Sequence, residues 1–204
     1  MNQKIEIVIF DLGGVLINWD PRNMYRKIFD DEEKMEYFLE NITTMDWNEQ
    51  QDAGYKLADA TEDLVAKFPE FEDEIRAYYG RWTEMLDGAK QGTVDLLTQI
   101  HEEKKYRLYA LTNWSGELFH HALERFPFLQ FFEGILVSGD EGLKKPDLKI
   151  YNLILDRYNI NPETAVFIDD NFKNIEAARK VKLQTIHFQS ETQLKKDLES
   201  LDVV

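Results

Sequence analysis

The chain has 204 residues, 43% hydrophobic and 13% aromatic, which suits one globular domain or one domain with a modest insertion. Its formal net charge of −15 argues against nucleic acid and anionic membrane surfaces as partners, and the absence of cysteine excludes disulfide and thiolate chemistry. The sequence shows no signal-peptide pattern and no apolar run near a membrane-spanning length of about 18 residues, so we expect a cytoplasmic protein.

The first predicted element is a buried strand over residues 5–10, an apolar run rich in β-branched residues. Residues 17–88 follow it, with apolar residues at helical spacing and no convincing strand pattern. Within this segment we expect Thr61 to cap the N-terminus of a helix, because two acidic residues come directly after it. We therefore interpret residues 17–88 as a helical insertion, and residues 1–16 with 89–204 as the core domain.

Four more buried strands are predicted after the insertion, and they alternate with apolar patterns of helical spacing. They span residues 106–111, 134–138, 165–169 and 184–188. Alternating strands and helices favour parallel βαβ units, and continuous apolarity within the strands favours a sheet that is covered on both faces. The predicted fold class is therefore α/β, with a doubly wound parallel sheet.

Polar residues follow the predicted strands, where the carboxyl ends of a parallel sheet would meet. In chain order they are Asp11, Thr112 with Asn113, Lys145 ahead of Pro146, and Asp169 with Asp170. Ligands bind outside the carboxyl ends of parallel strands, so we expect these side chains to share one site. A helix cap or a turn would explain each of them singly, but the order of carboxylate, hydroxyl, cation and acidic pair favours a common chemistry.

This set of groups suits phosphoryl transfer. A carboxylate such as Asp11 can attack phosphorus and form an aspartyl-phosphate, which divides hydrolysis into two easier steps. Thr112 and Lys145 could hold the oxygens over which the charge of the transferring group spreads. Asp11 and Asp170 are hard oxygen ligands suited to Mg²⁺, and the metal would offset the crowding of three carboxylates.

Four motifs cover nearly the whole chain: VIFDLGGVL, LTNW, KKPDLKIY and FIDDNFKNIEAA. In order and approximate spacing they resemble the motifs of the haloacid dehalogenase-like (HAD) hydrolase superfamily. The resemblance implies a Rossmann-like core and a helical cap formed by the insertion. It also implies roles for the motif residues: Asp11 as nucleophile, Thr112 as phosphate-binding hydroxyl, Lys145 as the cation that neutralises phosphate, Asp170 as metal ligand, and Asp169 as ligand or outer-shell partner.

Other residues are candidates for substrate or metal binding. Asn174 lies where related sequences often carry a polar residue that orients the site, and Asn113 and Trp114 directly follow the motif threonine. Arg22 could pair with a carboxylate or phosphate of the substrate. Gly13 has no side chain, but its backbone carbonyl could complete the metal site.

Gly13 is also the main departure from the pattern that this resemblance implies. Phosphatases of the superfamily usually carry an aspartate at this position, which protonates the leaving group and then activates water. Another acid could substitute for it, and the candidates are Asp20, Glu49 and Asp52. Alternatively the leaving group is a good one, such as the phosphate of a sugar hemiacetal. The sequence is most similar to a small bacterial branch with α-glucose-1-phosphate phosphatase-like proteins, which read D-L-G in the same way.

Two further alternatives remain open at this stage. 2-Haloacid dehalogenases also lack that aspartate, but they use no metal and lack the acidic pair that is present here. A binding or regulatory protein on the same scaffold would need no acid at all. We expect a Mg²⁺-dependent phosphatase that forms an aspartyl-phosphate and acts on a small phosphorylated metabolite, for example a sugar phosphate.

Overall fold

A computed structural model describes residues 4–204, and residues 1–3 of the predicted core domain lie outside the described residues. A five-stranded parallel sheet forms its centre, in the order β5-β4-β1-β6-β7. The strands are β1 (Ile7–Phe10), β4 (Arg107–Thr112), β5 (Gly134–Val137), β6 (Ala165–Asp169) and β7 (Gln184–His187). All five predicted strands and the doubly wound α/β fold class are confirmed.

The strand order places β1 in the middle of the sheet. Its last residue, Phe10, lies opposite Ala110 of β4 on one side and Ile168 of β6 on the other. The chain runs outward from β1 through β4 to β5 and then crosses back to β6 and β7. Such a reversal creates a crevice at the carboxyl ends of the strands around β1, which is the usual ligand site of an open α/β sheet.

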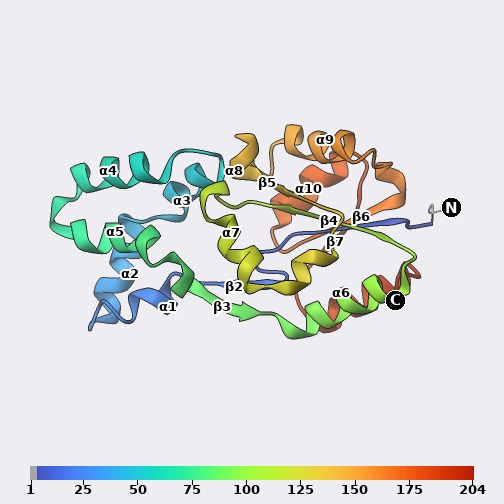
Figure 1. Cartoon of the computed structure of the whole chain (residues 1–204), viewed down its shortest axis with the longest axis horizontal. Coiled ribbons are helices and arrows are strands. Elements are labelled where there is room, and N and C mark those ends of the chain that lie inside the picture. Colours follow the sequence, from blue (N-terminus) through green and yellow to red (C-terminus); the bar gives the residue numbers. More distant parts are fainter. Residues whose placement is uncertain (1–3) are drawn as a thin grey trace.

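Both faces of the sheet are covered, as the continuous apolarity of the strands predicts. Ile7 and Ile9 pack in a cluster with α9 (Leu148–Arg157) and α10 (Phe172–Lys180). Val8 and Phe10 point to the opposite core, which three other helices cover: α6 (Gln91–Glu103), α7 (Gly116–Arg125) and α11 (Glu191–Ser200). In Figure 1, α9 and α10 lie above the strands and α6 lies below them.

Five helices lie between β2 (Ile17–Trp19) and β3 (Leu86–Ala89), and they form the left end of the molecule in Figure 1. They are α1 (Arg22–Tyr25), α2 (Glu32–Asn41), α3 (Met45–Asp52), α4 (Leu57–Lys67) and α5 (Glu72–Gly80). Aromatic rings hold them together, since the Tyr25 ring lies 5.0 Å from that of Phe38 and 6.2 Å from that of Tyr78 between centroids. The remaining elements are short: α8 (Ser138–Glu141), η1 (Pro69–Phe71), η2 (Trp82–Met85), η3 (Pro127–Phe131) and η4 (Pro162–Thr164).

The expectation that residues 17–88 contain no strand is wrong. β2 (Ile17–Trp19) pairs antiparallel with β3 (Leu86–Ala89), so the two ends of the helical segment run side by side. A strand of three residues shows no readable alternation, and its partner lies far away in the sequence, so local periodicity does not reveal the pair. Within residues 4–204, none of the helices combines the length and the apolar character that crossing a membrane would require.

Candidate active site

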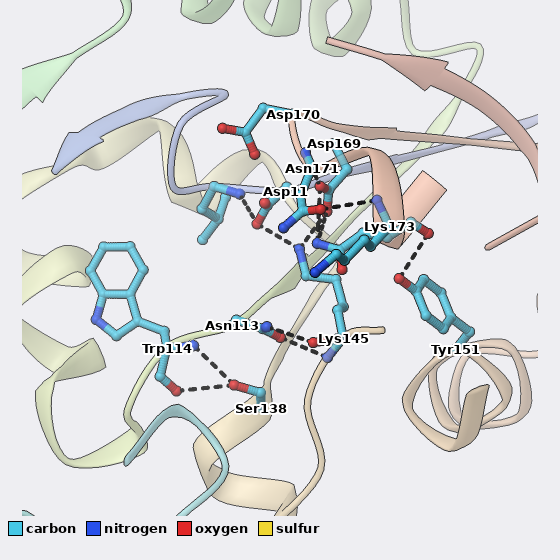
Figure 2. Close-up of polar contacts among 12 residues, drawn as sticks. Asp11, Asn113, Trp114, Ser138, Lys145, Tyr151, Asp169, Asp170, Asn171 and Lys173 are labelled. Carbon is cyan, nitrogen blue, oxygen red and sulfur yellow. Dashed lines mark hydrogen bonds and ion pairs between the residues drawn. The ribbon is translucent and has the colours of Figure 1, made fainter. Parts of the chain in front are cut away.

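Three adjacent strands deliver polar side chains to one edge of the sheet. Asp11 follows β1, Thr112 ends β4 and Asp169 ends β6, so all three lie at the carboxyl ends that flank the crevice. Lys145 reaches the same place from the loop after α8. Figure 2 shows its ammonium group directed at the carboxylates of Asp11 and Asp169. The structure therefore brings together the residues of all four motifs.

Lys145 forms a buried bridge between two carboxylates. Its Nζ atom lies 2.9 Å from Asp11 Oδ1 and 2.7 Å from Asp169 Oδ2, and the side chains of Lys145 and Asp169 are at most 1% exposed. Burial alone would lower the pKa of the Lys145 ammonium, but the charges of Asp11 and Asp169 raise it above its ordinary value. Lys145 is thus held as a cation beside Asp11.

Both carboxylate oxygens of Asp169 are occupied by hydrogen-bond donors. Asn174 Nδ2 lies 3.1 Å from each of them, and the backbone N–H of Asn171 donates to Oδ1 at 2.8 Å. Asn174 is in turn held by Tyr151, whose hydroxyl donates to the backbone carbonyl of Asn174 at 3.0 Å. This network favours a structural role for Asp169, in which it orients Lys145, over a role as a direct metal ligand.

Asp170 comes close to the nucleophile loop because of a glycine. A Cβ built on Gly14 would lie 2.1 Å from Asp170 Oδ2, and Gly14 has a φ of +75°, in the left-handed region that favours glycine. Ligand oxygens of Asp11, Asp169 and Asp170 lie within 4.8 Å of one another, a separation that one metal ion can bridge. The position of Asp170 therefore leaves no room for a side chain at residue 14.

Electrostatics indicate that this cluster holds more negative charge than its own cation balances. Burial raises the pKa of Asp11 to about 8; Lys145 opposes the rise, and Asp169 and Asp170 add to it. Burial and the charge of Asp169 also raise the pKa of Asp170. Three carboxylates with one lysine are a donor set that suits a divalent cation with oxygen ligands.

Thr112 and Asn113 have different environments although they are neighbours. The Thr112 hydroxyl is buried and has no hydrogen-bond partner among the described residues. An unpartnered buried hydroxyl is unfavourable. Unlike Asn113, Thr112 is not among the residues that line the cavity. Asn113 instead exchanges two hydrogen bonds with the backbone of Lys145, so it positions the lysine loop.

A cavity of about 310 Å³ opens above the cluster. Residues from the sheet end and from the helical segment line it together: Asp11, Gly13, Gly14, Trp19, Met45, Asn48, Glu49, Asp52, Tyr79, Trp82, Asn113, Trp114, Ser115, Leu118, Lys145, Asp170, Asn171 and Asn174. Trp82 and Trp114 make part of its wall, with ring centroids 5.3 Å apart in a T-shaped pair. Both carboxylates and aromatic side chains therefore line the cavity.

Arg22 and Asp20 are not brought to the site. Neither is among the residues that line the cavity. The Arg22 guanidinium donates to both carboxylate oxygens of Glu36 at 2.6 Å and also contacts Asp20 at 3.4 Å. The predicted pairing of Arg22 with a substrate therefore has no support in the structure, because its donors are used within the helical segment.

Several residues that line the cavity or hold its lining in place carry no sequence signal; Ser138 is one of the latter. Ser138 accepts a hydrogen bond from the backbone N–H of Trp114 at 2.9 Å and donates to the backbone carbonyl of Asp52. Tyr79, Trp82 and Asn48 come from the helical segment and carry no motif. Their aromatic or polar character was visible in the sequence, but only the packing of the segment shows that they face the cavity.

Comparison with known proteins identifies relatives among phosphatases. The chain is 27% identical over 187 residues to a sesquiterpene phosphatase of Aspergillus oryzae, which covers 92% of this chain and 91% of that protein. It is 24% identical over 186 residues to a phosphorylated carbohydrates phosphatase of Thermotoga maritima, covering 90% of this chain and 84% of that protein. Both matches extend over the core and the helical segment.

The fold is also that of a solved HAD family enzyme. The structure of an enzyme from Bacteroides thetaiotaomicron, in complex with magnesium and inorganic phosphate, matches with a TM-score of 0.68 at 24% identity. The match covers 91% of this chain and 94% of that one. The family model for haloacid dehalogenase-like hydrolases matches residues 5–182. This chain belongs to the haloacid dehalogenase-like hydrolase family.

Proposed function

We propose that the protein is a Mg²⁺-dependent phosphatase that acts on a small phosphorylated metabolite through an aspartyl-phosphate on Asp11. The observation that carries this proposal is the convergence of Asp11, Lys145 and Asp170 at the floor of one cavity. A carboxylate nucleophile, a fixed cation and a second hard-oxygen ligand are the groups that phosphoryl transfer requires.

The chain's own residues would bind and orient the phosphate. The Lys145 ammonium, 2.9 Å from Asp11 Oδ1, lies where it would contact a phosphoryl group that approaches the nucleophile. The buried Thr112 hydroxyl lacks a partner among the described residues and would donate to a phosphate oxygen. Charge on the transferring group spreads over its oxygens, so catalysis depends mostly on such positioned donors and cations.

The residues present fit a magnesium ion. Asp11, Asp170 and the backbone carbonyl of Gly13 would hold it, with Asp169 in the outer shell because its oxygens already accept hydrogen bonds. When bound, the ion would neutralise the carboxylates and a phosphate oxygen. Burial is the main reason that the pKa of Asp11 is raised, and the charges of Asp169 and Asp170 add to it, so a cation bound here would favour the ionised carboxylate.

The helices α1–α5 would act as a cap that closes the cavity over the substrate. Asn48, Glu49 and Asp52 of α3 and Tyr79 of α5 line the cavity opposite the sheet end. A cap excludes water from the first half-reaction and selects the substrate. A volume of about 310 Å³ suits a small metabolite, and a sugar phosphate remains our proposal for its class.

Dehalogenation is the competing proposal within this family. A halide leaves without a proton and brings no phosphate charge, so a dehalogenase has no use for a second exposed carboxylate beside its nucleophile. Asp170 lies within 4.8 Å of the Asp11 and Asp169 oxygens at the cavity, which favours the phosphatase. Its charge repels the Asp11 carboxylate, and a bound cation would offset that repulsion.

Phosphate release tests the proposal. Wild-type protein, Asp11→Asn and the surface control Asp156→Asn should be assayed on a panel of sugar, polyol and prenyl phosphates, with Mg²⁺ and with EDTA. We expect Mg²⁺-dependent turnover by wild type and Asp156→Asn and none by Asp11→Asn. Release of chloride from 2-chloropropionate without phosphate release would instead establish the dehalogenase. No turnover of any substrate by the folded protein would favour a binding function.

A further inference from the structure

The site described above has a nucleophile but no acid beside it. Gly13 lies two residues after Asp11, where it offers no proton to a departing alkoxide. The cavity contains two carboxylates besides the cluster of Asp11 and Asp170, namely Glu49 and Asp52, and both belong to α3. Glu49 and Asp52 are therefore the candidates for the acid that protonates the leaving group.

Asp52 and Glu49 differ in how they are bound. The Glu49 carboxylate forms an ion pair with Lys144, so its charge is already matched by a cation. Among residues 4–204, Asp52 has no ion-pair partner. Asn48 Nδ2 donates to its Oδ2 atom at 3.3 Å, and its carboxyl group also receives a hydrogen bond from the backbone N–H of Ser115. A carboxyl group without a cation partner, in a partly buried position, is suited to exist in both protonation states near neutral pH.

The charges around Asp52 agree with this assignment. Burial raises the pKa of Asp52 to about 7, and the negative charge of Glu49 adds to the rise; Lys144, the Ser115 N–H and Lys145 act against it. Tyr78 and Tyr79 of α5 also lie within electrostatic range of Asp52, and burial raises the pKa of each tyrosine, so both stay neutral. A general acid or base works best with a pKa near the working pH.

Asp52 is also fastened to the core, which would place it reproducibly. The Ser138 hydroxyl donates to its backbone carbonyl, and Ser138 itself accepts from the backbone N–H of Trp114 at 2.9 Å. Trp114 stands two residues after Thr112, at the end of β4. The last residue of α3 is thus connected through the Ser138 side chain to the segment that directly follows β4.

We propose that Asp52 is the general acid and general base of the reaction, supplied by the helical segment in place of the side chain that Gly13 lacks. The inference rests on the proposed phosphatase function. In the first step an Asp11 oxygen attacks phosphorus, the ester P–O bond breaks, and its electron pair stays on the ester oxygen. That oxygen takes the proton of the Asp52 carboxyl group, and the alcohol departs.

The second step returns both residues to their starting states. The Asp52 carboxylate accepts a proton from a water molecule as the water oxygen attacks phosphorus. The bond between phosphorus and the Asp11 oxygen breaks, its electrons return to the carboxylate, and inorganic phosphate leaves. No oxidant, reductant or further reactant is required.

The leaving-group dependence of kcat/KM distinguishes this role from a structural one. kcat/KM reports the steps up to release of the alcohol, and p-nitrophenolate leaves without protonation whereas an alkoxide does not. For Asp52→Asn we expect kcat/KM on an alkyl phosphate to fall about 10²–10⁴-fold and on p-nitrophenyl phosphate to change less than tenfold. An equal loss on both substrates would show that Asp52 only fastens the helical segment and would overturn the proposal.

Asp46→Asn is the matched control, since it removes a carboxylate from the exposed first turn of the same helix. It should leave both kcat/KM values near those of wild type. The proposed function and the role of Asp52 can be overturned separately. Asp11→Asn tests the nucleophile. If the wild-type protein releases no phosphate from any substrate, both proposals are overturned. If Asp11→Asn is inactive but Asp52→Asn behaves as wild type on the alkyl phosphate, only the role of Asp52 is overturned.

A gain-of-function variant provides an independent test. A Cβ built on Gly13 meets no atom within 4 Å, and Gly13 does not have the positive φ of Gly14. The first side-chain atom of an aspartate therefore has room there, and the backbone accepts an L residue. We expect the double variant Gly13→Asp with Asp52→Asn to have a kcat/KM on the alkyl phosphate at least tenfold higher than that of Asp52→Asn alone. Failure of the double variant, with its fold intact by circular dichroism, would count against protonation as the missing function.

The pH dependence gives a third readout. Wild type should lose kcat/KM on the alkyl phosphate as the pH rises through about 7, because the acid form of Asp52 is consumed. The same substrate with Asp52→Asn should show no such decrease. Substrate ionisation is common to both profiles, so their ratio isolates the enzyme group. Identical profiles would overturn the proposal.

Discussion

Asn113 and Lys145 are joined by a reciprocal pair of hydrogen bonds. Asn113 Nδ2 donates to the Lys145 carbonyl at 3.0 Å, and the Lys145 N–H donates to Asn113 Oδ1 at 2.8 Å. The pair links the end of β4 to the loop after α8, two segments that are 32 residues apart in the sequence. The backbone of Lys145, which carries the buried ammonium, is therefore positioned by the side-chain amide that directly follows β4 (Figure 2).

We predict that Asn113→Ala lowers activity by misplacing Lys145. The variant leaves the Lys145 N–H and carbonyl without these partners, so we expect it to lose about 1–3 kcal/mol of unfolding free energy. kcat should fall more than KM rises, because the reacting groups are displaced in every bound state. Urea unfolding and steady-state kinetics measure both effects. Asn152→Ala, on the exposed face of α9, should change neither, and an unaltered kcat in Asn113→Ala would contradict the prediction.

We predict that the stability and the activity of the Lys145 cluster separate in a double variant. Lys145→Met leaves two carboxylates buried without their cation and should cost about 3–5 kcal/mol of stability. Adding Asp169→Asn removes one of these charges and should recover part of that stability while activity stays lost. Thermal unfolding and phosphate release report the two quantities. If the losses of stability in the two single variants simply add in the double variant, the ion-pair bridge of Lys145 between Asp11 and Asp169 would be contradicted.

Gly14→Ala is predicted to impair metal use. The new methyl group would overlap Asp170 Oδ2 and the φ of +75° would become strained, at roughly 1–3 kcal/mol. Because Asp170 must move, we expect a higher Mg²⁺ concentration for half-maximal activity. Gly80→Ala is the control, since a Cβ there meets nothing within 4 Å. A Mg²⁺ dependence equal to that of wild type would show that Asp170 is not a ligand.

Stability should depend on pH through Asp52. Its pKa is 3.8 in the unfolded reference and about 7 in the fold, so the folded state holds the proton more tightly. The native state consequently loses stability as the pH rises from about 4 to about 7, and the loss persists above that range. Asp52→Asn cannot ionise and avoids this penalty. Its melting temperature relative to wild type should therefore be higher at pH 8 than at pH 5. An equal difference at both pH values would contradict the assigned pKa.

The sequence predicts the core of this fold well for physical reasons. Strands such as β1 and β6 are buried on both faces, so they appear as continuous apolar runs that no other local structure explains. The polar residues Asp11 and Asp169 end these runs, and parallel topology then brings them together. Four short motifs thus contain most of the information about the floor of the cavity.

The helical segment was less predictable because its structure depends on packing. Thr61 was expected to cap a helix, but α4 begins at Leu57 and the Thr61 hydroxyl donates to the Leu57 carbonyl within it. Arg22 was expected at the substrate, but it binds Glu36 of α2 instead. In a chain with 39 acidic residues, the choice of partner for one arginine is decided by tertiary contacts.

The pairing of β2 with β3 affects how the helical segment between them could vary in sequence and length. Ile17 lies opposite Ala89, and the Asp20 N–H donates to the Met85 carbonyl at 2.9 Å, so residues 21–84 are attached at neighbouring points. The entropy of closing such a segment grows only slowly with its length. We therefore expect that residues 21–84 could be exchanged for a longer or shorter sequence while the sheet is retained. New substrate preferences could be acquired by replacing this module, and each replacement would have to bring its own proton donor.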